Sequence, residues 1–167
     1  IELDTADFAA DIERRRGGQA HTTPRIESDT PTLLSGLYKG HTTGAPLSIL
    51  FHNQAHQSSD YAALAVTPRP GHADWVAAHK FGGQNDPRGG GHFSGRLTVA
   101  LVAAGVVAKK IVGAKITARV CEIGGENNPA KWQDMLTQAA SDGDSLGGIV
   151  ECRAEGVGVG LGEPFFD

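Results

Sequence analysis

The sequence predicts an α+β domain with layered helices and strands, and three observations lead to this fold class. Apolar residues recur at helical spacing in some segments and alternate with polar residues in others. The predicted order is helix, hairpin, helices, strand, helix, strand, which differs from a regular βαβ repeat. A chain of 167 residues, 40% of them hydrophobic, can bury one core, so we expect residues 1–167 to form a single domain.

The N-terminal residues predict a helix. Asp4 or Thr5 can cap it, and Phe8 and Ile12 place apolar side chains on one face. The helix ends in three arginines, after which two glycines break it. We expect the segment from there to about residue 31 to be an exposed, polar connection.

The next segments predict a hairpin, a loop and a short helix. The apolar runs LLSGLY and LSILFHN flank KGHTTGAP, a spacing that favours a β-hairpin with a long connection. The stretch QAHQSSDYAALAVTPRPG has no clear periodicity and predicts an irregular loop. Residues 72–81 predict a short helix, and the loop GGQNDPRGGGHF follows it.

The second half predicts two further helices and two strands. Helical spacing is clearest over residues 94–112, where small side chains indicate a buried helix. KITARVCEI and GGIVECRAEG alternate as strands do, and Asn128 followed by Pro129 favours a helix start between them. Cys121 and Cys152 lie within these strands without CxxC spacing, and we expect both to be buried free thiols.

Composition argues against several classes of partner. The formal net charge of −4 and the pI near 6.0 disfavour general binding to nucleic acid or membranes, which usually depends on an excess of basic residues. No apolar run approaches the roughly 20 residues that span a bilayer. We therefore expect a cytoplasmic protein in which a local cluster of side chains holds any bound anion.

Two glycine-containing motifs, RPGHAD at residues 69–74 and RGGGHFSGR at residues 88–96, indicate an anion site. A glycine-rich loop that leads into a helix exposes backbone N–H groups, which favour an anion near Ser94 and Arg96. Arginines strengthen this prediction because a guanidinium binds carboxylate or phosphate in a bidentate manner. The alternative is that each arginine pairs with a surface carboxylate. The candidates are Arg15, Arg25, Arg69, Arg88 and Arg96.

His72 is the candidate proton-transfer residue. It follows a proline-glycine turn and precedes Asp74, so its imidazole can enter a cleft and exchange a proton near neutral pH. A structural or merely exposed histidine is the alternative. No metal site is predicted, because His52 and His56 could lie together only on a helix, whereas LSILFHN predicts a strand, and no third ligand is obvious. The sequence also contains no phosphate-loop, nucleophile-elbow or dinucleotide-binding glycine motif.

Many motifs occur in the order in which they follow one another in the chorismate synthase family. They are RRR-GG with TTPR, LLSGLYKGHTTGAPLSILFHN, SSDY, RPGHAD, RGGGHFSGRLT, VAAGVVAKK, GDSLGGIVE and GLGEPFFD, and they span residues 14–167. The chain therefore resembles the central portion of a chorismate synthase. The resemblance implies a layered β-α-β sandwich of that type, here incomplete.

The resemblance also implies a reaction and a cofactor. In this 1,4-elimination, phosphate leaves C3 of 5-enolpyruvylshikimate 3-phosphate and a proton leaves C6, which gives chorismate for aromatic amino acid biosynthesis. Reduced FMN is required although no net oxidation occurs, and NADPH would serve only as a reductant in a bifunctional protein. A homotetramer is implied as well.

Matched motif positions assign roles to individual residues. His72 corresponds to a catalytic histidine thought to protonate the reduced flavin. The residues implied to bind substrate are Arg15, Arg25, Arg69, Ser94 and Arg96. The residues implied to contact FMN are His92, Phe93 and Ser94. We expect these side chains to converge on one pocket.

The chain departs from the family pattern in several places. Gly17 replaces the proline of RRRPG, and HFSGR stands where the family has RSSAR, so that His92 and Phe93 replace an arginine and a serine. The family's N-terminal GESHG segment and its C-terminal region lie outside this chain, and we expect the 167 residues alone to have little or no lyase activity. A catalytically silent anion-binding or assembly module is the alternative function. Single-stranded RNA binding is disfavoured by the acidic balance and the few aromatic residues.

Overall fold

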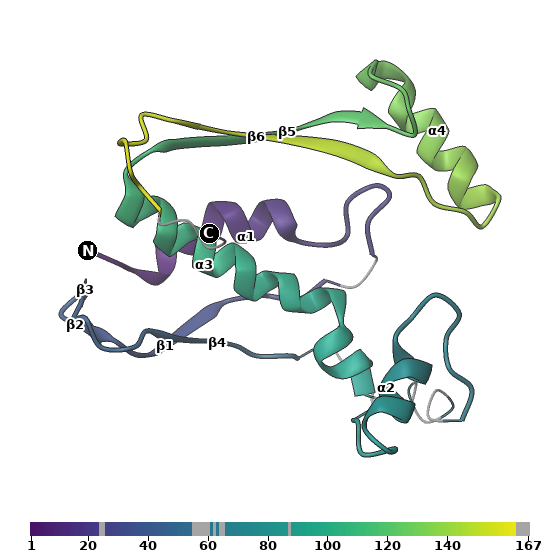
Figure 1. The fold of residues 1–167 in the computed structure, drawn as a ribbon, viewed down its shortest axis with the longest axis horizontal. Helices are drawn as coiled ribbons and strands as arrows, with labels where there is room; N and C mark the ends of the chain where they lie inside the picture. Colours follow the sequence, from purple (N-terminus) through teal and green to yellow (C-terminus); the bar gives the residue numbers. More distant parts are fainter. Residues whose placement is uncertain (24–25, 55–60, 62, 64–65, 87, 163–167) are drawn as a thin grey trace. The chain divides into compact units, whose positions relative to one another are not determined.

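The computed structural model describes residues 1–167 apart from 24–25, 55–60, 62, 64–65, 87 and 163–167. Its contacts divide the chain into two units, one of Ile1–Gly18 with Thr23–Val106 and one of Gln19–Thr22 with Val107–Asp167. Helices and antiparallel strands occur in both units (Figure 1), so the predicted α+β class is confirmed. The expectation of one domain stays a prediction. Half of the stretch predicted as an irregular loop lies outside the described residues.

The N-terminal helix forms as predicted, with Asp4 as its cap. A 3-10 turn, η1 (Thr5–Phe8), leads into α1 (Ala9–Arg15). Asp4 Oδ1 accepts a hydrogen bond from the Ala6 N–H at 2.9 Å, and Asp4 N–H donates to the Asp7 carboxylate at 2.8 Å. This reciprocal capping satisfies N–H groups that have no partner within the helix. Phe8 and Ile12 are buried on one face, which fixes α1 against the core of the first unit.

The predicted hairpin forms between β1 (Pro31–Ser35) and β4 (Ser48–Phe51), which pair antiparallel. Its long connection is itself a small hairpin of β2 (Leu37–Tyr38) and β3 (His41–Thr42). Lys39 and Gly40 form the turn with φ of +48° and +77°. Two successive positive φ values match the right-handed twist of the flanking strands, which explains how so short a hairpin closes.

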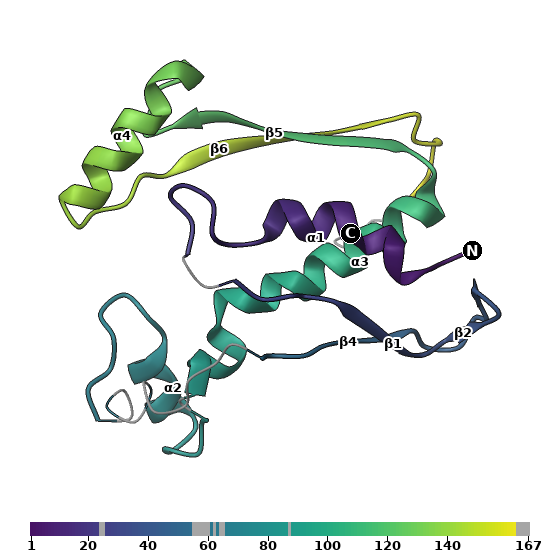
Figure 2. The same cartoon turned by 180° about the vertical axis from the view of Figure 1, so that it is seen from behind.

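The central helices of the first unit follow the sequence prediction closely. They are α2 (Asp74–Lys80), the 3-10 turns η4 (Arg88–Phe93) and η5 (Gly95–Leu97), and α3 (Thr98–Val112), of which the residues after Val106 belong to the second unit. α1 runs beside the first part of α3 in both Figure 1 and Figure 2. The core of this unit consists of Leu3, Phe8, Ile12, Ala77, Val99, Ala103 and Val106.

The expectation that α3 is buried holds for one face only. Val99, Ala103 and Val106 are buried, whereas Leu101 is 73% exposed and Ile111 is 66% exposed. Among the described residues, packing neighbours cover only the first face. The apolar composition of the helix therefore predicted more burial than this chain provides.

The second unit contains a long hairpin with a helix inserted between its strands. β5 (Lys115–Ile123) pairs antiparallel with β6 (Gly148–Glu155), and α4 (Pro129–Ser141) follows β5. The predicted strands and helix are thus confirmed. The prediction of buried thiols is wrong for Cys152, which is exposed, and Cys121 is only half-buried. Within the described part of this unit the sheet has two strands, and most residues of both strands are exposed.

Asn128 caps α4, and its replacement by alanine should destabilise the second unit. The Asn128 side-chain oxygen accepts a hydrogen bond from the Ala130 N–H at 3.1 Å, and Pro129 occupies the first turn. Loss of such a cap costs about 1 kcal/mol, so Asn128→Ala should lower the midpoint of urea unfolding. Asn127→Ala removes the same atoms one position earlier and should change the midpoint much less. Equal effects of the two variants would contradict the capping role.

Candidate functional site

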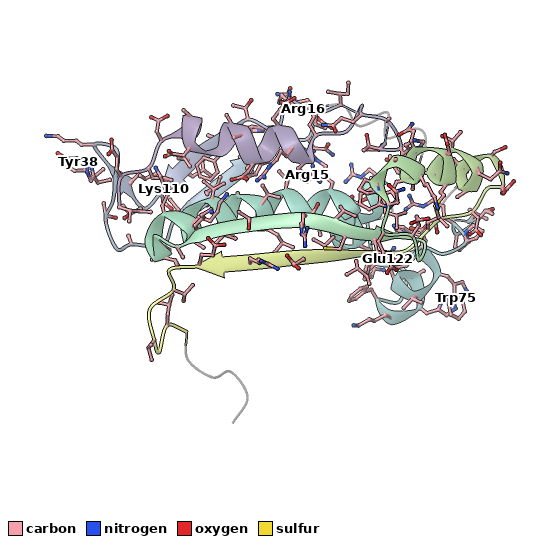
Figure 3. The ribbon with its side chains drawn as sticks, turned by 90° about the horizontal axis from the view of Figure 1, so that it is seen from above. Arg15, Arg16, Tyr38, Trp75, Lys110 and Glu122 are labelled. Carbon is pink, nitrogen blue, oxygen red and sulfur yellow. The ribbon has the colours of Figure 1, made fainter. Side chains whose placement is uncertain are left out.

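A cavity of about 320 Å³ lies in the first unit where the N-terminal helix ends and the second glycine-rich motif begins. Arg15 reaches it from the end of α1, and Ser94 and Arg96 reach it from the η5 turn. Figure 3 shows Arg15 on the side of α1 that faces α3 and Arg16 on the opposite side. The complete lining is Arg15, Gly17, Thr23, Glu27, Asp29, Ser94, Gly95 and Arg96.

Asp29 joins the two arginines of this cavity. Its carboxylate is almost fully buried, with Oδ2 at 3.3 Å from Arg15 Nη1 and Oδ1 at 2.6 Å from Arg96 Nη1. The Arg96 contact is an ion pair whose geometry is not that of a hydrogen bond. Because a buried carboxylate needs compensating charge, the two guanidiniums and Asp29 stabilise one another inside the cavity wall.

Further hydrogen bonds fix each guanidinium. Arg15 Nε donates to Thr98 Oγ1 at 3.1 Å, and Arg15 Nη2 donates to the Arg96 carbonyl oxygen at 3.1 Å. Arg96 Nη2 donates to the His52 carbonyl oxygen at 3.1 Å, and the backbone N–H of Arg96 donates to Ser94 Oγ at 3.2 Å, which fixes the main chain there. The arginines are therefore held by groups from three separate segments of the chain. Such fixed guanidiniums lose little conformational entropy on binding an anion.

A second cavity, of about 400 Å³, shares Ser94 and Arg96 with the first. Its walls combine apolar side chains from β4 and the start of α3 with a few polar groups. Cavities of this size and composition are typical of sites for cofactors and other small molecules. The lining residues are Ile49, Phe51, Asn53, Arg88, Gly91, Ser94, Arg96, Leu97, Val99 and Ala100.

The RPGHAD motif forms a separate cluster around Asp74 at the start of α2. Arg69 binds its carboxylate in a bidentate manner, with Nε at 2.7 Å from Oδ2 and Nη2 at 2.9 Å from Oδ1. His72 Nδ1 lies 2.7 Å from Asp74 Oδ1. Arg69 Nη2 lies 3.2 Å from His72 Nδ1 and 3.3 Å from His72 Nε2.

The ion pair between Arg69 and Asp74 shifts the pKa values of both side chains. The hydrogen bond from the Arg69 side chain holds the pKa of Asp74 well below its usual range, and burial opposes this shift. The same bond raises the pKa of Arg69. Both groups are therefore charged at neutral pH, and Asp74 is an acceptor that fixes the orientation of the imidazole.

Asp74→Asn should destabilise the protein at neutral pH, and the destabilisation should be smaller under acid conditions. A carboxyl whose folded pKa is lowered stabilises the fold above its unfolded pKa of about 4, and this contribution disappears as the pH falls through the folded value. We expect a loss of about 1–2 kcal/mol at pH 7, limited by the partial exposure of Arg69. Thermal melts between pH 7 and pH 3 should show the gap to wild type narrowing.

Asp86→Asn is the matched control for this pH dependence. Asp86 also pairs with an arginine, Arg88, but both side chains are more than half exposed. The hydrogen bond from Arg88 lowers the pKa of Asp86 to about 2, yet exposed pairs contribute little to stability. A gap between Asp74→Asn and wild type that stays constant across this pH range would contradict the prediction.

The structure brings together some of the predicted site residues. Arg15, Ser94 and Arg96 line one cavity, whereas neither Arg69 nor His72 lines either cavity. Their convergence on one pocket stays a prediction. Arg88 lines the second cavity and also pairs with Asp86, so its predicted role stays a prediction.

The remaining predicted residues contribute less to the described site. Phe93 contacts Phe81, with ring centroids 6.5 Å apart. Arg25 and the side chain of His92 lie outside the described part of the structure.

Sequence reasoning missed two buried acids of this site. Glu27 and Asp29 were expected in an exposed connection, but they are 6% and 2% exposed. The connection turns inward because Asp29 pairs with Arg15 and Arg96, and Glu27 accepts a hydrogen bond from the Gln54 N–H at 3.2 Å. Nothing in the local pattern separates these acids from the exposed ones, so no sequence signal could have identified them.

The described residues contain neither a cluster of metal-ligand side chains nor a membrane-spanning helix. Among the residues with described placement, no group of three or more His, Cys, Asp or Glu side chains could hold a metal ion. In the same part of the chain, no helix is long and apolar enough to cross a membrane.

Comparisons with known proteins agree on one family. A family model described as chorismate synthase matches residues 1–167. The chain is 54% identical to the chorismate synthase of Chitinophaga pinensis, over 100% of this chain and 50% of that protein. It is 41% identical to that of Pyrococcus abyssi, over 99% of this chain and 53% of that protein. The chain thus spans about half the length of the curated relatives it matches.

The solved structures support the fold. A crystal structure of a chorismate synthase matches 90% of this chain and 50% of its own chain, with a TM-score of 0.59 and 22% identity. The fold and the first cavity define an α+β protein with a polar cavity whose wall contains two fixed arginines. Because the family model covers every residue from first to last, the chain belongs to the chorismate synthase family.

Proposed function

We propose that the full-length protein is a chorismate synthase, which eliminates phosphate from 5-enolpyruvylshikimate 3-phosphate to give chorismate. The observation that carries this proposal, beyond family membership, is the cavity in which Arg15, Ser94 and Arg96 come together. Phosphate leaves C3 and a proton leaves C6, so electrons balance without net oxidation. Homotetramer formation, cytoplasmic location and a place in aromatic amino acid biosynthesis are proposals on the same basis.

The substrate carries two carboxylates and a phosphate, so its binding requires several fixed donors. Arg15 and Arg96 supply guanidiniums at one cavity, and the Ser94 hydroxyl lies beside them. Each Nη carries two hydrogens, and the internal contacts of these arginines leave donors that can bind an anion. We propose that these three residues and Arg69 orient the substrate, and that Arg25 contributes as well.

The residues of the second cavity fit reduced FMN. Apolar side chains such as Phe51 and Val99 suit a planar ring system, and Arg88 and Arg96 suit its phosphate. When bound, reduced FMN would lend electron density to the departing C–O bond. We propose that Ser94, with His92 and Phe93, contributes to holding it. A nicotinamide cofactor would be needed only if the protein reduces its own flavin.

We propose that His72 holds and transfers a proton at Nε2. Asp74 Oδ1 lies 2.7 Å from Nδ1, and this close carboxylate supports a role for Asp74 in orienting the imidazole. A general acid or base of this kind contributes about 10²–10⁴-fold to a rate.

An anaerobic assay of the full-length protein tests the proposed function. Chemically reduced FMN and 5-enolpyruvylshikimate 3-phosphate should give equal amounts of phosphate and chorismate, whereas oxidised FMN should give neither. Residues 1–167 alone should have little or no turnover. Absence of phosphate release by a folded, flavin-binding full-length protein would favour a catalytically silent anion-binding module instead.

A further inference from the structure

We propose that Asp29 is a positioning residue, which holds the guanidiniums of Arg15 and Arg96 at the angles required to bind an anion. This inference deepens the proposed function and rests on the same cavity. Asp29 is 2% exposed, lines the cavity and contacts both arginines through different carboxylate oxygens. One buried carboxylate therefore sets the separation of two cations that come from distant parts of the chain.

The backbone at Asp29 supports a specific role for this residue. Its φ of +46° lies in the left-handed region, which most residues other than glycine avoid and which aspartate and asparagine adopt more often than other side chains do. This conformation accompanies the turn of the chain into β1 and the inward placement of the carboxylate between the arginines. Asn suits the same backbone, so Asp29→Asn removes the charge with little change in shape.

A purely electrostatic effect of Asp29 and a positioning role for it predict opposite changes in the affinity of Asp29→Asn for an anion. Asp29 is a negative group beside an anion site, so Coulomb's law predicts that neutralising it would tighten anion binding. If Asp29 instead orients Arg15 and Arg96, its neutralisation releases both guanidiniums and weakens binding. The sign of the change in affinity therefore separates the two explanations.

Titration of the full-length protein with inorganic phosphate tests the proposal without flavin or turnover. Asp29→Asn should raise the phosphate Kd about tenfold or more, equivalent to about 1.4 kcal/mol. Glu155→Gln neutralises an acid that pairs with Lys115 on the exposed hairpin of the second unit, and it should leave the Kd within about twofold of wild type. An unchanged or lower Kd for Asp29→Asn, or no phosphate binding by the wild type, would overturn the proposal.

A double-variant comparison separates positioning from a general loss of structure. In a background carrying Arg15→Gln and Arg96→Gln, Asp29→Asn should cause no further loss of phosphate affinity, because the residues through which it acts are gone. A further loss of the same size would overturn the proposal. If Asp29→Asn does not fold, Asp29→Glu keeps the charge but displaces the carboxylate by one methylene. That variant should melt near wild type and still bind phosphate more weakly.

The readouts also distinguish this proposal from the proposed function. If the protein is a lyase, Asp29→Glu should raise the KM for the phosphorylated substrate more than it lowers kcat. If the protein releases no phosphate but the titrations behave as expected, the lyase proposal fails and the positioning role of Asp29 stands. Normal phosphate affinity and normal KM in Asp29→Glu would overturn the positioning role alone.

Discussion

Arg96→Ala in the full-length protein should lower kcat/KM for the elimination by about 30-fold or more, the largest effect that we expect from a single arginine. Arg96 lines both cavities and pairs with the buried Asp29. Truncating one member of a buried charge pair costs about 2–5 kcal/mol. The measurement is steady-state kinetics with reduced FMN held at saturation.

Two further variants test whether the effect of Arg96→Ala depends on the guanidinium geometry and on this position in the chain. Arg96→Lys keeps the charge but loses the planar donor geometry, so its kcat/KM should fall between that of Arg96→Ala and that of wild type. Arg14→Ala removes an arginine of α1 whose side chain is 76% exposed, and its kcat/KM should stay near wild type. An Arg96→Ala protein that folds and retains kcat/KM within about threefold of wild type would rule out this role for Arg96.

His72→Gln should lower kcat by about 10²–10⁴-fold, the range for loss of a general acid or base. We expect binding of substrate and of reduced FMN to change much less than kcat, because the imidazole is proposed to move a proton rather than to hold the ligand. Glutamine still reaches Asp74 with its amide, so the Arg69–Asp74 pair should persist. Rapid-quench kinetics and a pH profile of kcat measure the effect.

His79→Gln is the matched control for His72. His79 lies on α2, seven residues further on, and its Nδ1 contacts the Trp75 carbonyl oxygen at 2.8 Å on an exposed surface. Its replacement should leave kcat unchanged. If the two histidine variants lower kcat equally, or if His72→Gln acts only through a higher KM, the proton-transfer role of His72 is wrong.

Local chemistry made several elements predictable. Asp4 and Asn128 cap helices as expected, because an N-cap needs only a short polar side chain and the N–H groups two or three residues later. β5 and β6 alternate in sequence and pair in the structure. The connection of the first hairpin was harder to predict, because Lys39 tolerates a positive φ without a typical sequence signal.

Burial was predicted less well because it depends on which segments meet. The composition of α3 suggested a buried helix, yet Leu101 is exposed, and Cys152 was expected to be buried but is exposed. Conversely, Glu27 and Asp29 are polar residues in a connection and are nevertheless buried. In each case the outcome depends on neighbours that are remote in sequence, which no local pattern specifies.

The sequence by itself determined the family, the helix caps, the order of elements and the residue types of the anion site. These follow from motif order and from interactions within a few residues of the chain. Only the tertiary structure decided that Arg15 and Arg96 share a cavity, that Asp29 lies between them, and that His72 belongs with Arg69 and Asp74. The physical reason is that a buried carboxylate must be compensated by cations, and folding supplies those cations from segments far apart in the chain.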